Sequence, residues 1–166
     1  AEDTPDAWCA LRESYIKSCG GRPVKNFERW IYQRDEPGYE TTPILKIHHP
    51  IQMWMVEPGK YYDFIARKGK KIGFNVDDRL FPGGEQPVVV KVSYYDGVQG
   101  SLKLVYENNS GKQNATVTTT GEDKIRTATF FINARMDQTN FDHDFDFVLE
   151  SAEEIPVAFL RVIKNG

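Results

Sequence analysis

Hydrophobic and polar residues alternate along three consecutive segments in the middle of the chain. Such a period of two predicts β-strands, because successive side chains of a strand point to opposite faces of its sheet. Turn-forming residues separate the segments, at 81–84 and again at 96–100. The pattern predicts antiparallel strands with one buried face. The alternating apolar positions are Ile72, Phe74 and Val76, then Val88, Val90, Val92 and Tyr94, then Leu102, Leu104 and Tyr106.

The same signals extend this prediction along most of the 166 residues. Roughly ten strands with short polar turns favour an all-β fold, an antiparallel β-sandwich of the jelly-roll type, as a single domain over residues 1–166. Residues 1–6 are predicted to be a loose tail, 67–71 a basic loop and 134–144 an irregular loop. The other expected strands cover residues 26–34, 41–47, 51–56, 61–66, 116–120, 126–132, 145–149 and 157–163.

The parity of these strands predicts which side chains form the core. We also expect the first strand to pair near the last, at 157–163, because the ends of domains often lie close together. Residues 7–13 fit a helix or a strand equally well, which leaves the pairing of Cys9 with Cys19 open: a helix would hold them ~15 Å apart, beyond the ~7 Å that a disulfide allows. The predicted core residues are Phe74, Val90, Val92, Tyr94, Leu104, Phe147 and Phe159.

Composition narrows the classes of partner. The net charge of −3 argues against a nucleic-acid or anionic-membrane partner. No apolar run approaches the ~20 residues of a membrane-spanning helix. Aromatic residues make up 13% of the chain, which draws attention to those that strand parity places on outer faces.

Exposed aromatic rings can stack on the apolar faces of sugars, while polar side chains bond to the hydroxyl groups. Large aromatic residues also dominate cores, so each candidate has a structural alternative. Tyr95 lies on the face opposite Tyr94, and Trp54 on the face opposite Met53 and Met55. The predicted stacking residues are Trp30, Trp54 and Tyr95, with Arg34, Asp77 and Asn140 as hydrogen-bond partners.

Sequence patterns for metal binding and catalysis are weaker. Oxygen ligands for calcium are available at 77–78 and at 140–146, yet Phe145 and Phe147 alternate with the second group, which favours a strand with aspartates on its wet face. His48 and His49 are adjacent and would point to opposite faces of a strand. The expected cofactors are therefore none, with calcium as an open possibility. The basic run 67–71 could meet sulfate or uronate groups of an acidic glycan, although a solvated loop is the simpler reading.

One set of segments forms a recognisable pattern: residues 26–35, 65–67, 72–78 and 92–96, and the pairing of 126–130 with 144–146. These segments resemble accessory β-sandwich domains that are appended to secreted bacterial glycoside hydrolases and look like carbohydrate-binding modules. The resemblance covers nearly the whole chain. The acidic segment 137–144 departs from the glycine-containing loop of that pattern.

The resemblance implies non-catalytic binding of a polysaccharide, a linked catalytic domain as partner, and a secreted or cell-surface location. Two alternatives stay open at this point. One is a structural accessory domain without a ligand, and the other is a small sandwich-fold polysaccharide lyase or hydrolase. A fold-level analogy alone does not establish function, because one fold can carry many different sites.

Overall fold

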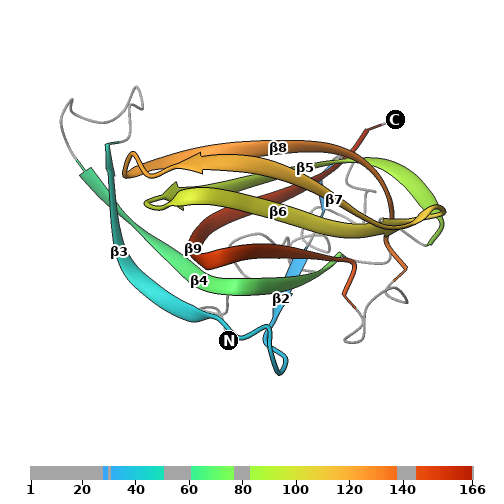
Figure 1. Cartoon of the computed structure of the whole chain (residues 1–166), viewed down its shortest axis with the longest axis horizontal. Coiled ribbons are helices and arrows are strands. Elements are labelled where there is room, and N and C mark those ends of the chain that lie inside the picture. The colour runs from blue at the N-terminus through green and yellow to red at the C-terminus, as the bar shows by residue number, and fades with distance from the viewer. Residues whose placement is uncertain (1–27, 30, 51–60, 77–82, 138–144, 166) are drawn as a thin grey trace, which may run out of the picture.

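A computed structural model describes residues 28–29, 31–50, 61–76, 83–137 and 145–165 (Figure 1). For 28–29, 31–34, 45–50 and 61–65 it describes the backbone alone. The expectations for Cys9, Cys19, the 1–6 tail and the 51–56 strand lie outside these residues. None of the described residues forms a helix long and apolar enough to cross a membrane.

The described part of the chain is all-β and antiparallel, as the alternation predicts. Nine strands are present in it: β1 (Glu28–Arg29), β2 (Ile31–Arg34), β3 (Thr42–Pro50), β4 (Tyr61–Val76), β5 (Glu85–Asp96), β6 (Gln99–Asn108), β7 (Gly111–Thr120), β8 (Lys124–Arg135) and β9 (Phe147–Lys164). A tight turn joins β6 and β7, where Asn108 pairs with Gly111. Residues 121–123 connect β7 to β8.

Strand β9 joins two groups of strands, because its two halves have different neighbours (Figure 1). Its first residues, 147–150, lie between β4 and β6, and β4 and β6 in turn pair with β2 and β7. Its last residues pair with β5, which pairs with β8 on its other side. The sequence predicted two separate closing strands here, whereas the structure has one long strand.

The first described strand pairs with the end of the last one, as expected. Glu28 and Arg29 of β1 lie opposite Ile163 and Val162 of β9. The described chain therefore begins and ends side by side in one sheet.

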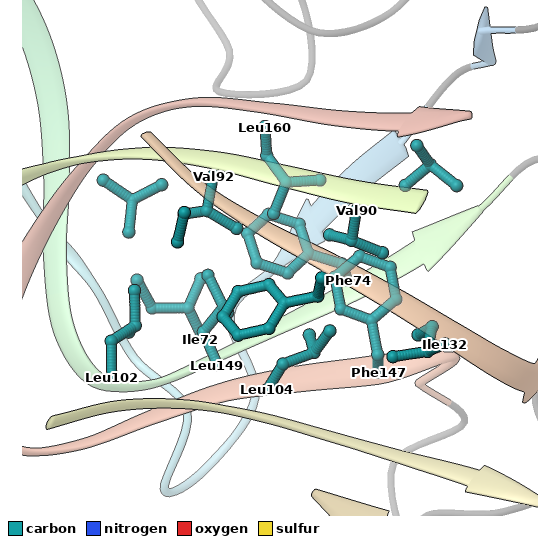
Figure 2. Close-up of a cluster of buried hydrophobic side chains, with 14 of the residues drawn as sticks. Ile72, Phe74, Val90, Val92, Leu102, Leu104, Ile132, Phe147, Leu149 and Leu160 are labelled. Carbon is teal, nitrogen blue, oxygen red and sulfur yellow. The ribbon is translucent and has the colours of Figure 1, made fainter. Parts of the chain in front are cut away.

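The inward-facing side chains of both groups of strands form a single core (Figure 2). Phe74 and Phe147 stack near its centre, with 5.3 Å between ring centroids. Burial confirms six of the seven predicted core residues: Phe74, Val90, Val92, Tyr94, Leu104 and Phe147.

The seventh prediction, Phe159, is wrong, since 38% of this residue is exposed. A register shift between Ser93 and Tyr94 on β5 accommodates an extra residue on β9. Such a bulge moves the following side chains to the other face of the strand. As a result Leu160 and Val162 point into the core and Phe159 points outward.

The prediction of a basic loop over residues 67–71 is also wrong. These residues form the middle of β4, where Arg67 and Lys68 pair with β3 on one side and with β9 on the other. The run has no alternating apolar side chains. Its backbone pairing with β3 and β9 places it in the sheet. Its lysines are consequently fixed on a strand.

Candidate functional site

A groove of about 420 Å³ opens on the outer side of β4, β6 and β9. Its lining side chains are the outward-facing neighbours of core residues, since Lys71 precedes the buried Ile72 and Lys103 follows the buried Leu102. The groove is therefore carried by the same strands that build the core. Its lining residues are Lys70, Lys71, Ser101, Lys103, Glu150, Ser151 and Ala152.

Strand register aligns three charged residues across the groove. Glu150 of β9 lies opposite Lys71 of β4 on one side and opposite Lys103 of β6 on the other. Neighbouring strands are ~4.8 Å apart, so the backbones that carry the two lysines are separated by roughly 9.6 Å. Opposite charges on directly facing strand positions stabilise such a row.

An irregularity in β9 shapes one wall of the groove. Gly69 pairs with Ile155, but Lys71 pairs with Glu150, so residues 151–154 of β9 are accommodated opposite Lys70. Extra residues in one strand bend it and re-aim its side chains. Here they bring Ser151 and Ala152 to the rim of the groove.

An aromatic cluster supports Lys71 from the other side. The Lys71 Nζ atom lies 5.5 Å from the centroid of the Tyr39 ring, a cation–π distance. Tyr39 in turn meets Phe145 edge to face at 5.0 Å. The Phe145 ring is buried against Gly73, where a Cβ atom would lie 2.4 Å from it. Glycine at this position therefore lets Phe145 reach the outer face of β4.

A hydrogen-bond network ties the segment that carries Tyr39 to β4. The Thr41 N–H and hydroxyl groups donate to Asp35 Oδ1 at 3.1 and 2.9 Å. The Arg67 guanidinium donates to the Thr41 hydroxyl at 2.6 Å and pairs with Asp35 at 3.0 Å. Because Arg67 belongs to β4, this network holds residues 35–41 beside the strand that supplies Lys70 and Lys71.

The groove has a positive balance although the chain as a whole is negative. Three lysines and one glutamate line it, which gives a local charge of +2 against a net charge of −3 for the chain. Serine hydroxyls at 101 and 151 add neutral donors and acceptors. Such a surface is suited to hydroxyl groups and to negatively charged groups.

Of the six predicted site residues, the structure describes the side chain of Tyr95. Trp30, Trp54, Asp77 and Asn140 lie outside the described residues. Arg34 is described by its backbone, which pairs with Gly73 at the edge of β4. Their roles in ligand binding stay predictions.

Tyr95 is half-buried and has partners of its own. Its hydroxyl donates to Asp123 Oδ1 at 3.2 Å, and its ring packs so closely on Gly97 that a Cβ there would lie 2.8 Å from it. Partial burial and this hydrogen bond raise the pKa of Tyr95. These contacts give Tyr95 a structural part beside the turn between β5 and β6, and its stacking on a sugar stays a prediction.

Asp96 anchors the same turn from inside. Only 1% of Asp96 is exposed, and its carboxylate accepts from the Thr120 N–H, the Thr120 hydroxyl and the Gly121 N–H, at 2.7–3.1 Å. Arg126 Nε lies 2.9 Å from its Oδ2. Burial works against the charged form, but the hydrogen bonds and the arginine outweigh it and hold the pKa of Asp96 below its usual value.

Asp146 is the described member of the acidic group considered for calcium. The expectation of a wet strand face is wrong for Asp146, which is fully buried just before β9. Its Oδ2 accepts from the Val76 N–H at 2.7 Å, and its own N–H donates to the Phe74 carbonyl at 2.9 Å. These bonds attach the start of β9 to β4. Within the described residues, no group of three or more His, Cys, Asp or Glu side chains is placed to hold a metal ion.

Sequence reasoning missed most of the groove. The basic run at 67–71 pointed to two of its lysines, but Ser101, Lys103, Glu150 and Ser151 carried no local signal. They meet because of the register among three strands that are distant in sequence. That register was not readable from any one segment.

No protein-family model matches the chain, and a search of curated proteins finds no match.

Proposed function

We propose that the chain is a non-catalytic carbohydrate-binding module that keeps a linked polysaccharide-degrading enzyme at its glycan, outside the cell. The observation that carries this proposal is the groove over β4, β6 and β9. It offers ammonium, hydroxyl and carboxylate groups on a fixed strand surface. Hydroxyl-rich ligands need such donors and acceptors at close spacing.

The position of the groove supports binding by a preformed surface. Its side chains alternate with buried core residues on β4, β6 and β9, so their backbone positions are set by the core. A ligand that binds such a surface loses little affinity to rearrangement of the protein. Tyr39 adds an aromatic ring next to Lys71.

The chemistry of the lining residues favours binding over glycoside cleavage. Hydrolysis of a glycosidic bond generally uses two carboxyl groups that face each other across the scissile bond. The groove is lined by one carboxylate, Glu150, whose strand neighbours are Lys71 and Lys103. We therefore assign Glu150 to ligand contact and to the local charge balance.

The fold fits the same proposal. Two groups of strands share β9 and bury one core, which supports a β-sandwich of the jelly-roll type. A module of this kind would act by raising the effective concentration of a linked enzyme at the polysaccharide surface. Partners of this class are polysaccharides and a linked catalytic domain.

Calorimetry of the intact chain against plant, algal and host polysaccharides tests the proposal. We expect at least one ligand with a Kd of roughly 10 μM to 1 mM. The Lys71→Gln and Lys103→Gln variants should weaken that binding, while Lys124→Gln, outside the groove, should not. Failure to bind any polysaccharide of the panel would overturn the proposal.

A second candidate function, a structural accessory domain, is favoured by one observation. Phe131 on β8 is 74% exposed, and on the next strand its partner is the apolar Val89. Contiguous exposed apolar surface often marks contacts between domains, and Phe131 would contribute to such a surface. If the panel yields no ligand, the Phe131→Ser variant should change the association of the chain with a linked domain.

A further inference from the structure

We propose that the ligand of the groove is an anionic glycan, whose sulfate or carboxylate groups are bound by Lys70, Lys71 and Lys103. This inference rests on the proposed function and specifies its ligand class. Three lysines converge here from β4 and β6 on a chain whose net charge is −3. The groove is thus a locally positive surface on a chain of negative net charge.

The register of the strands spaces the positive charges. Lys71 and Lys103 stand on either side of Glu150, two strand separations apart, which is roughly 9.6 Å between backbones. That separation is of the order of one disaccharide along an extended polysaccharide. Anionic groups on alternate sugars would therefore meet one lysine each.

Glu150, between Lys71 and Lys103, makes this row of side chains selective for the spacing of the ligand's charges. A carboxylate between two lysines repels a ligand charge placed directly above it and can accept hydrogen bonds from sugar hydroxyls instead. The row thus matches a ligand in which charged and hydroxyl groups alternate. A uniformly and densely charged polymer would meet Glu150 unfavourably.

The surroundings hold Lys71 ready for an anion. Its Nζ lies over the Tyr39 ring, an attraction that leaves the ammonium donors available for hydrogen bonds. The ammonium group is a compact point charge with three donors, which suits both sulfate and carboxylate oxygens. Because the groove is open to solvent, salt should weaken binding, with a screening length of about 10 Å at 0.1 M.

The test uses matched pairs of polymers with the intact chain: dextran and dextran sulfate of low substitution, and fully and partly methyl-esterified pectin. We expect the charged member of one or both pairs to bind at least about tenfold more tightly than its neutral counterpart, and to lose affinity as salt rises. The pair that responds separates sulfate from carboxylate recognition. Double-stranded DNA serves as a polyanion without sugar hydroxyls in the same arrangement.

Five variants are expected to change the affinity in different directions or to leave it unchanged. Lys71→Gln and Lys103→Gln should each weaken binding of the charged polymer about tenfold. Glu150→Gln should strengthen it, a gain that a merely destabilised protein would not produce. Lys103→Arg should keep most of the affinity, and Lys124→Gln, whose ammonium pairs with Glu122 on the exposed surface, should leave it unchanged.

The results separate this inference from the proposed function. Equal binding of neutral and charged members, insensitive to the lysine variants, overturns the anionic ligand and leaves carbohydrate binding in place. DNA binding as tight as that of the charged glycans overturns it in favour of simple polyanion attraction. Absence of binding to both charged polymers overturns the anionic ligand, and absence of binding to the whole polysaccharide panel as well overturns the proposed function.

Discussion

The two faces of β4 differ in what their side chains do: one face packs in the core, and the other lines the groove. On the inner face Ile72, Phe74 and Val76 are buried in the core. On the outer face Lys71 lines the groove and Gly73 lies beneath the Phe145 ring. Since neighbouring residues of a strand point in opposite directions, the comparison shows that stability and binding can be altered separately within one short segment.

The largest effect is expected on the inner face. Phe74→Ala should lower the free energy of unfolding by ~3–5 kcal/mol, because it leaves a cavity next to Phe147. Phe147→Ala should cost a similar amount. Urea denaturation measures this loss, and the exposed Phe131→Ala, with an effect within ~0.5 kcal/mol, is the matched control. Equal losses for the buried and exposed phenylalanines would contradict the assigned core.

A smaller loss of stability is expected on the outer face of β4, where the Phe145 ring covers Gly73. Gly73→Ala places a Cβ atom 2.4 Å from the Phe145 ring, so the ring must move, at a cost of about 1–3 kcal/mol. Gly100→Ala is the control, because its nearest contact, the Thr119 hydroxyl, is 3.8 Å away. Thermal unfolding compares the two variants. A second change, Phe145→Ala, should make the Gly73→Ala loss smaller than additive.

Acid should lower the free energy of unfolding through Asp96, a residue of β5 outside both faces of β4. The pKa of Asp96 is lowered in the folded state, so its contribution to stability is complete above its ordinary pKa of 3.8 and is lost as pH falls through the folded pKa. Denaturant midpoints between about pH 7 and about pH 3 should therefore fall more steeply for the natural chain than for Asp96→Asn. Parallel curves would show that another carboxylate dominates acid unfolding, and Glu122→Gln tests its exposed neighbour on Arg126.

The smallest stability effects are expected in the groove itself. Lys71→Gln should cost about 0.5–1 kcal/mol through its contact with Tyr39. Lys70→Gln should stay within ~0.5 kcal/mol, because Lys70 is exposed. Urea denaturation and calorimetry on the same samples compare the two. A groove lysine whose loss unfolds the protein would contradict the separation of the two faces.

The strands were predictable from sequence because alternation reports burial directly. Phe74, Val90 and Leu104 have the inward parity that the pattern gives them. The prediction that Phe159 is buried was wrong because a bulge shifts the parity of β9 locally, and no residue type at that position indicates a bulge. The prediction of a loop over residues 67–71 was wrong because a charged strand that pairs through its backbone on both sides shows no alternation.

The candidate site was predictable only in part. Lys70 and Lys71 were visible as a basic run, and their chemistry suggested sulfate or uronate groups. Glu150 joins them by pairing with Lys71 across ~80 residues of chain, and Lys103 joins by pairing with Glu150 across ~50 residues, so both contacts depend on the whole topology. Tyr95 was placed correctly opposite Tyr94, but the close approach of its ring to Gly97 depends on a turn geometry that alternation does not report.

The shared strand β9 has a consequence for how the chain reaches its native state. Residues 147–150 complete one group of strands, and residues 157–164 complete the other. Neither group can therefore be complete before this late segment of the chain has been synthesised. During synthesis β4, β5 and β6 leave the ribosome with their central partner still missing. Such long-range pairings slow folding and leave strand edges open to aggregation. Assembly of the core should therefore follow the arrival of β9 as a late, concerted step.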